Sequence, residues 1–218
     1  MANEEHVALL KQGVEAWNTW RSENLNIRPD LGKADLREAK LGKAPLEYPF
    51  GVNLVQANLS GADLRAADLS EADLVQAELF DADLSGANLS KANLTGAFLA
   101  YARLIGANLN GAQLDGAFLT QANLSGADLR GASLQAVALV DADLTGADLT
   151  GCHIYGISAW GLKLKGAKQQ NLVITHVRHD VDEPTVTVDN IEVAQFVTSC
   201  FTTKRFATPS TPSGGRPC

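Results

Sequence analysis

A leucine stands at every fifth position from Leu54 to Leu149, twenty in succession, and an alanine stands two residues before almost every one. Residues five apart drift around a helix axis and form no face, because a helix turns about 100° per residue. A flat strand also fails, since an odd period sends successive leucines to opposite sides. The chain must therefore bend once in every repeat, and four sides of five residues close a square. We expect an all-β fold, a right-handed, four-sided β-solenoid.

The small residue before each leucine has a role in packing. Two leucines on each side would overfill so narrow a square, so alanine leaves the space that one leucine needs. One coil cannot bury its own apolar side chains, and stability must come from the stacking of neighbouring coils. Glycine often follows two residues after the leucine, at corners that tolerate positive φ, although Gln56, Ala66 and Glu71 occupy the same slot.

The repeats extend beyond this block in both directions. The pattern begins with four earlier leucines, which are Leu31, Leu36, Leu41 and Leu46. A short insertion of three residues is predicted near 47–51, as a bulged corner or loop. The signal weakens towards Ile174, with a break at Ala167 and Gln169. We expect a solenoid over 27–175 with about seven coils, which at the spacing of neighbouring strands gives a length of about 34 Å.

Segments of different character flank the repeats. Residues 5–23 predict one amphipathic helix within an N-terminal cap over 1–26, which would cover the open end of the solenoid. Its apolar positions are Val7, Leu10, Val14, Trp17 and Trp20. Residues 176–201 predict a charged loop, an extended stretch over Pro184–Asp189 and a short helix over Asn190–Phe201. Residues 202–218 are rich in Thr, Ser, Pro and Gly and predict a disordered tail.

Composition narrows the class of protein. The formal net charge of −7 and the pI near 5.0 argue against general nucleic-acid binding. No apolar run is long enough to span a membrane, and Glu4 and Glu5 stand where a signal peptide would be basic, so we expect a soluble cytoplasmic protein. The spacing of the three cysteines predicts neither a disulfide framework nor a zinc site, and one of them falls at a small core position; they are Cys152, Cys200 and Cys218.

The segment ANLSGADLRAADLSEADL resembles the A(D/N)LXX pattern of the pentapeptide-repeat family. The resemblance covers about Ile27 to Ile174, and it implies a right-handed quadrilateral β-helix in a protein that is not an enzyme. The flanks EHVALLKQGVEAWNTWR and DEPTVTVDNIEVAQFV are similar to those of a bacterial subgroup, in which a C-terminal effector-like domain often follows. Because the amphipathic pattern stops after Val197, one hypothesis is that the tail is read in a shifted frame.

One face of the predicted solenoid is aromatic. Residues twenty apart stack on the same face, and this face presents Phe80, Phe98, Tyr101, Phe118, Val140 and Trp160. We expect Phe98 and Phe118 to lie one above the other, about 5 Å apart. Exposed apolar patches of this kind mark a surface for a protein partner or for a homodimer. The alternatives are a terminal segment folded over the patch, or a ladder that only stiffens the sheet.

The other faces are polar and acidic. Between Phe50 and Thr150 twelve acidic residues stand against four basic ones. Two acidic faces are predicted, one with Asp63, Asp83 and Asp143, the other with Asp68, Asp128 and Asp148. Asp or Asn before the leucine can bond to neighbouring backbone and stack in ladders, which is the explanation that we favour. The functional alternative is DNA mimicry, as in the gyrase-protecting members of the family.

Motifs that carry chemistry are missing from the sequence. It has no P-loop, no dinucleotide glycine fingerprint, no nucleophile elbow and no HExxH. A loose cluster lacks a second ligand pair, so no metal site is predicted at His176, His179, Asp180 and Asp182. The sequence predicts a non-enzymatic protein-interaction or sensor scaffold without a cofactor, which binds neither nucleic acid nor membrane. The alternative is an acidic DNA mimic that binds a type II topoisomerase.

Overall fold

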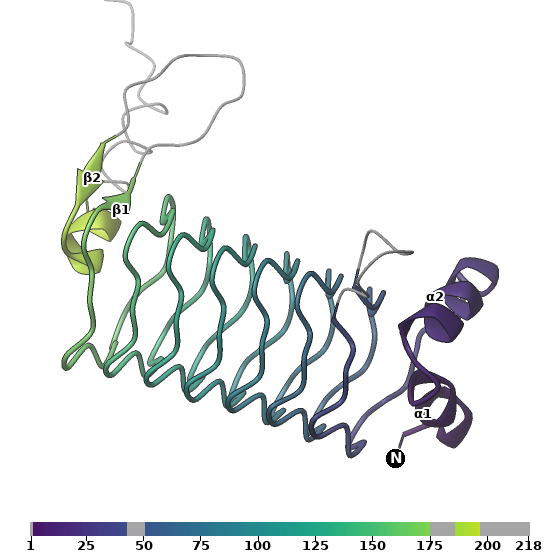
Figure 1. Cartoon of the computed structure of the whole chain (residues 1–218). Coiled ribbons are helices and arrows are strands. Elements are labelled where there is room, and N and C mark those ends of the chain that lie inside the picture. Colours follow the sequence, from purple (N-terminus) through teal and green to yellow (C-terminus); the bar gives the residue numbers. More distant parts are fainter. Residues whose placement is uncertain (1, 43–50, 175–185, 197–218) are drawn as a thin grey trace, which may run out of the picture.

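The computed structural model describes residues 2–42, 51–174 and 186–196. Figure 1 shows a rod of stacked coils with two helices, α1 and α2, at its N-terminal end. A small hairpin of two strands, β1 and β2, lies at the other end together with a helical turn. The axis of the rod therefore follows the sequence from one cap to the other.

Parallel bridges connect each coil to the next along four sides. The bridged residues are twenty apart through most of the rod, as in Asn53 with Asp73. Each leucine N–H donates to the carbonyl oxygen of the residue before the leucine in the next coil, as Leu54 does to Asp73 at 2.7 Å. The four-sided coil agrees with the prediction. However, its sides are isolated single-residue bridges, so the fold contains much less regular strand than the term all-β implies.

Leucine and alanine fill the interior. Every leucine of the block from Leu54 to Leu149 is at most 1% exposed, and the alanines two residues before these leucines are equally buried. Cys152 occupies an alanine position and is buried as predicted, with its Sγ 2.9 Å from the carbonyl oxygen of Leu129. Burial raises the pKa of the Cys152 thiol to about 12, so this cysteine behaves as a small core residue.

The corners between the sides are turns with one residue at positive φ. The alanine N–H donates to the carbonyl oxygen of the leucine three residues earlier, as Ala57 does to Leu54 at 3.0 Å. The residue before that alanine has φ near 60°, whether it is glycine, as Gly61 at 65°, or not, as Gln56 at 57°. Positive φ at this place is typical of a type II turn, which favours glycine without requiring it.

The first coil corrects the predicted insertion. Its bridges join residues 28 apart, as in Asp35 with Asp63, so eight extra residues stand in this coil. The Val52 N–H donates to Leu41 O at 3.1 Å, the bond that closes an ordinary corner. Leu54 therefore forms the side after Leu41, and the predicted repeat at Leu46 is wrong, although Leu46 itself lies outside the described residues. A single corner hydrogen bond is enough to close a side of the coil, so the first coil accommodates eight extra residues between Leu41 and Val52.

The predicted single helix over 5–23 is also wrong, because the chain forms two helices. Helix α1 covers Glu4–Leu10 and α2 covers Val14–Glu23. Between them Gly13 has φ 116°, a conformation that interrupts a helix and that glycine adopts readily. Asn3 caps α1, since its side chain accepts the N–H groups of Glu5 and His6. The two helices together still form the predicted N-terminal cap.

The cap bonds to the open edge of the first coil through side chains. The Trp17 indole is fully buried and its Nε1 donates to Asn53 O at 2.7 Å. Asn18 Oδ1 accepts the Asn53 N–H at 2.8 Å. Arg21 is buried as well, and its guanidinium donates to carbonyl oxygens that include Ile27 O at 2.7 Å. These bonds satisfy backbone groups that would otherwise have no partner coil.

A hairpin and a helical turn close the C-terminal end. Strand β1 (Leu172–Val173) pairs antiparallel with β2 (Thr187–Val188), and residues 191–196 are helical. Gln169 stands where the repeat would place a leucine, and its Oε1 accepts the Ile191 N–H at 2.9 Å, which ties the helical turn to the last coil. The Gln195 side chain likewise accepts the Ala159 N–H at 2.7 Å. The predicted charged loop and tail lie outside the described residues, as does the second half of the predicted helix.

Candidate protein-interaction faces

The aromatic face has the geometry that the sequence predicts. Phe98 and Phe118 form a parallel bridge, and their rings stack with centroids 5.2 Å apart and planes 2° from parallel. Phe80 and Tyr101 meet edge to face, with centroids 5.2 Å apart. The Phe98–Phe118 stack arises because residues one coil apart are held at the spacing of neighbouring strands, about 4.8 Å, which lies within the range of centroid separations that offset-stacked rings prefer.

The aromatic side chains of this face are open to solvent. Phe98 is 43% exposed, Phe118 is 46% exposed and Trp160 is 67% exposed. Val140 is only half-buried. Phe98, Phe118 and Val140 point outward because each lies next to a buried leucine, and Trp160 lies next to Ala159, which is buried at a leucine position. These outward apolar side chains form the aromatic strip of the rod, with ring contacts between Phe98 and Phe118 and between Phe80 and Tyr101.

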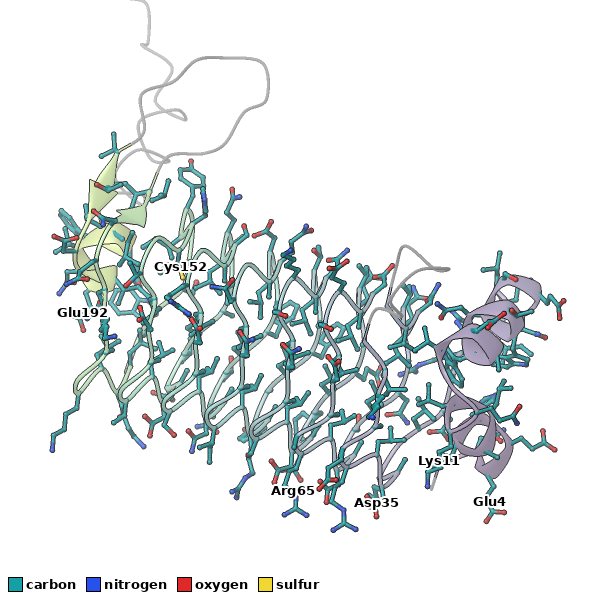
Figure 2. All side chains as sticks on the ribbon, in the orientation of Figure 1. Glu4, Lys11, Asp35, Arg65, Cys152 and Glu192 are labelled. Atoms are coloured by element: carbon teal, nitrogen blue, oxygen red, sulfur yellow. The ribbon has the colours of Figure 1, made fainter. Side chains whose placement is uncertain are left out.

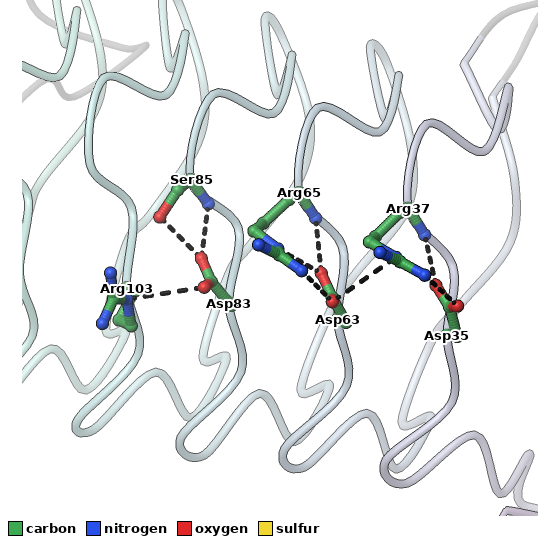
Figure 3. Close-up of polar contacts among 7 residues, drawn as sticks. All are labelled: Asp35, Arg37, Asp63, Arg65, Asp83, Ser85 and Arg103. Carbon is green, nitrogen blue, oxygen red and sulfur yellow. Dashed lines mark hydrogen bonds and ion pairs between the residues drawn. The ribbon is translucent and has the colours of Figure 1, made fainter.

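Ion pairs neutralise most of the first predicted acidic face, which contains Asp63, Asp83 and Asp143. Figure 3 shows Arg65 beside Asp63, with Nη2 and Oδ2 2.7 Å apart. Arg103 lies 3.4 Å from Asp83, and the Lys163 Nζ lies 3.5 Å from Asp143. The side-chain hydrogen bond from Arg65 lowers the pKa of Asp63, although partial desolvation opposes that shift. Carboxylates of this face therefore carry little unpaired negative charge.

The second predicted acidic face follows the same rule. Arg130 is 2.6 Å from Asp128, and Lys168 is 3.2 Å from Asp148. The side-chain bond from Arg130 lowers the pKa of Asp128. Burial raises the pKa of Asp148, but its bonds to Thr150 and Lys168 outweigh that effect and the pKa is lowered. Among the residues that the structure describes, five of the six selected aspartates thus lie beside a cation, and Asp68 is the exception.

Local hydrogen bonds explain why Asp or Asn precedes most leucines. The side-chain Oδ1 accepts the N–H two residues later, as Asp143 does from Thr145 at 3.0 Å. Amide side chains also bond along a column from coil to coil. Asn108 Nδ2 donates to Asn88 Oδ1 at 3.1 Å, and Asn88 Nδ2 donates to Asp68 Oδ1 at 3.0 Å. The backbone bonds and the ladders that we expected are both present.

The part of the chain that the structure describes contains no cluster of metal-ligating side chains and no helix that could span a membrane. Across residues 2–42, 51–174 and 186–196, no three His, Cys, Asp or Glu side chains are arranged to hold a metal ion. The cluster at His176, His179, Asp180 and Asp182 lies outside these ranges. Within them, every helix is too short or too polar to cross a bilayer.

Sequence reasoning missed the ion pairs of the two predicted acidic faces. A signal for the ion pairs was available, because Arg65 and Arg130 each stand two residues after an aspartate, on the same side of the coil.

A family model matches the repeats. The family model for pentapeptide repeats matches eight copies, over residues 50–86, 82–121 and 112–151. A search of curated proteins found no match. Among solved structures, the chain is similar to HetL, a pentapeptide repeat protein involved in heterocyst differentiation regulation in the cyanobacterium Nostoc sp. strain PCC 7120. The identity is 27%, over 72% of this chain and 96% of HetL, with a TM-score of 0.36.

Two further solved structures show similar coverage. One is trypsin-treated QnrB1, a plasmid-mediated fluoroquinolone resistance protein, at 18% identity over 65% of this chain and 84% of that one, with a TM-score of 0.38. The other is a pentapeptide repeat protein from the Arabidopsis thaliana thylakoid lumen. It is 27% identical over 63% of this chain and 90% of that one, with a TM-score of 0.27.

Proposed function

Because the chain belongs to the pentapeptide-repeat family through residues 50–151, we propose that it is a non-enzymatic scaffold that binds a protein partner. In this proposal it is a right-handed quadrilateral β-helix of about seven coils that acts in the bacterial cytoplasm. A rod of repeated coils presents broad faces rather than an enclosed reaction centre. Binding by such a protein therefore depends on the side chains that depart from the repeat.

The aromatic strip is the departure that best supports this function. Phe98 and Phe118 replace the Asp or Asn that most repeats carry, and nearly half of each residue's surface is exposed. Covering the open half of a phenylalanine contributes about 1 kcal/mol, so the stacked pair supplies about 2 kcal/mol to an interface. That contribution corresponds to about a 30-fold change in Kd. Aromatic side chains that project together from a rigid surface are typical interface anchors.

A pair of double variants tests the proposal. Phe98→Ser with Phe118→Ser removes the stack, and Asn93→Ser with Gln113→Ser changes the bridged pair on a neighbouring side of the same coils. Partner capture from the native host is measured for both variants, and light scattering detects self-association. We expect the phenylalanine variant alone to lose binding by about 30-fold. Equal binding by the two variants would refute a role for the aromatic face.

A second candidate is an acidic mimic of DNA that binds gyrase. The excess of acidic residues between Phe50 and Thr150, twelve against four, favours it. The cations beside Asp63, Asp83 and Asp128 weigh against it, because a mimic of phosphates needs unpaired negative charge. A supercoiling assay with gyrase, with and without a quinolone, separates the candidates. Inhibition or protection at micromolar protein would favour mimicry, and no effect would remove it.

A further inference from the structure

The aromatic face has two outward positions in each coil, one before and one after the buried residue of that side. In the four coils from Leu99 to Ala159, one of the two outward side chains is larger and the other is smaller. Parallel bridges hold these coils in register, so the face presents projections with a recess beside each one. Phe98 is paired in this way with Ala100, Phe118 with Thr120 and Trp160 with Ser158.

This pattern fits a second copy of itself that is related by a two-fold axis parallel to the rod. The two rods then lie side by side and point the same way, and each coil meets the same coil of the other copy. The rotation exchanges the position before the buried residue with the position after it. Phe98 of one copy therefore enters the recess over Ala100 of the other, and Phe118 enters the recess over Thr120. Interlocking of this kind is typical of the core of a stable interface.

The same rotation gives suitable neighbours to the rings at the edges of the face. Tyr101 stands at a corner of its coil and meets the opposite corner of the other copy at Gly96, which has no side chain. Phe80 faces Glu78, whose carboxylate is held in an ion pair with Arg28. No two rings of the face are placed head-on in this arrangement.

The distribution of charge favours the same contact. The outward and corner residues of the four coils from Leu99 to Ala159 all lie in the described part of the chain, and among them Asp141 carries the one charge. The rotation places Asp141 against Ala136. A neighbouring face of the same coils carries ion pairs such as Lys163 with Asp143. Because the cores of interfaces between identical subunits are apolar and depleted in charge, the aromatic face is the one that a second copy fits.

The open apolar area approaches what a dimer needs. Four of the rings are between 43% and 49% exposed, and Trp160 is 67% exposed. Since an aromatic side chain buries about 150–250 Å² when it is fully covered, the five rings leave roughly 500 Å² open. A standard interface buries about 800 Å² on each partner, and the smaller residues between the rings extend the area toward that value.

The caps leave this length of the rod free for a neighbour. Figure 2 shows side chains projecting from the coils along the whole rod, between α1 and α2 at one end and the hairpin at the other. We propose that a second copy of this chain covers the aromatic face, in a parallel pair of rods with two-fold symmetry. A two-fold contact uses the same surface on both copies, so the assembly closes as a dimer. This inference rests on the proposed function, because it names the protein that occupies the same face.

Sedimentation equilibrium of the purified full chain, over about 1–100 µM, tests for the dimer. We expect the mass to double with a Kd in the micromolar range. Phe98→Ser with Phe118→Ser should weaken the association by about 1,000-fold, because each copy contributes one stack and each stack accounts for about 30-fold. Asn93→Ser with Gln113→Ser changes a neighbouring side of the same coils and should associate like the parent.

A block swap tests the way in which the two faces interlock. Phe98→Ala, Ala100→Phe, Phe118→Thr and Thr120→Phe are made together, which keeps the composition of the face and exchanges its projections and recesses. In a parallel dimer of two swapped chains each phenylalanine again meets a recess, so their Kd should stay within about threefold of the parent value. A swapped chain opposite a parent chain sets phenylalanine against phenylalanine, and this mixed pair should be weaker by at least about 30-fold.

Native mass spectrometry counts the mixed pairs, with the parent labelled with nitrogen-15 because both chains otherwise have the same mass. Dimers of like chains should predominate. Mixed dimers in the proportion of random pairing would overturn the proposal, as would a swapped chain that keeps the parent's thermal midpoint and stays monomeric. Self-association that survives Phe98→Ser with Phe118→Ser would overturn it too. A parent that stays monomeric at 100 µM, yet captures another protein through Phe98 and Phe118, would overturn this inference and leave the proposed function standing. If neither self-association nor capture depends on the two rings, both fail together.

Discussion

Exchanging glycine and alanine within one column of corners tests the source of the glycine pattern. Ala66 and Gly126 stand at the same corner of different coils, with φ of 54° and 68°. A Cβ added at Gly126 would meet no atom within 4 Å. Any loss of stability on Gly126→Ala must therefore come from backbone conformation and not from a clash.

The expected size of the effect follows from two opposing terms. A residue with a Cβ costs roughly 1–2 kcal/mol in the left-handed region, and glycine loses about 0.5–1 kcal/mol more conformational freedom on folding. The difference leaves about 0.5–1 kcal/mol in favour of glycine at these corners. Ala66→Gly should raise the free energy of unfolding by that amount, and Gly126→Ala should lower it equally.

Urea unfolding measures both changes as midpoint shifts at an unchanged slope. Ala100→Gly is the control, because Ala100 lies outside the set of residues with positive φ. The same substitution should destabilise the protein there, by about 0.5–1 kcal/mol. If Ala66→Gly and Ala100→Gly both destabilise, the turns do not penalise a side chain and the explanation of the glycine column is wrong.

Three further measurements address the cap, the core and the charges. Trp17→Phe removes the hydrogen bond from the buried ring to Asn53 O and should lower the free energy of unfolding by about 1–3 kcal/mol, seen as a lower thermal midpoint. An unchanged midpoint would mean that this bond between the cap and the first coil does not stabilise the protein. Leu104→Ala opens a cavity in the middle of the rod and should lower the free energy of unfolding, measured in urea, by about 3–5 kcal/mol. A loss under about 1 kcal/mol would mean that the neighbouring coils move in and fill the cavity. Arginine partners lower the pKa values of Asp63 and Asp128 in the folded protein. The stability that these two aspartates contribute is therefore complete above the pKa of an unfolded aspartate, near 3.9, and is lost as the pH falls through their pKa values in the folded protein. Thermal midpoints should therefore drop below about pH 4, and a midpoint that rises on acidification would contradict this sign.

The five-residue period predicted the main features of the rod because it leaves little geometric freedom. Once four sides close a coil, the sequence number alone assigns a side chain to a face. The stacking of Phe98 on Phe118 could be predicted to within a fraction of an ångström for this reason, with 5.2 Å found against about 5 Å expected. The burial of the leucines follows from the same argument.

The errors arose where a segment imitates the pattern. Ala44 and Leu46 repeat the spacing of a true side, and only the bond from Val52 to Leu41 reveals that Leu54 takes this place. The apolar residues of the cap keep helical spacing across Gly13, although the backbone turns there. Periodicity reports which side chains share an environment, and it does not report whether the backbone between them is continuous.

The aromatic strip can be separated from a merely structural ladder by restoring the repeat. Asp and Asn before a leucine accept the N–H two residues later, a bond worth about 0.5–1.5 kcal/mol, and Phe98 and Phe118 cannot accept it. Their ring stacking returns a similar amount, about 0.5–1.5 kcal/mol. Phe98→Asn with Phe118→Asn should therefore leave the free energy of unfolding within about 1 kcal/mol of the parent while it weakens partner binding by about 30-fold. If urea unfolding instead shows that the free energy of unfolding falls by much more than this while partner binding is retained, the two rings stabilise the rod and the aromatic face is not an interface.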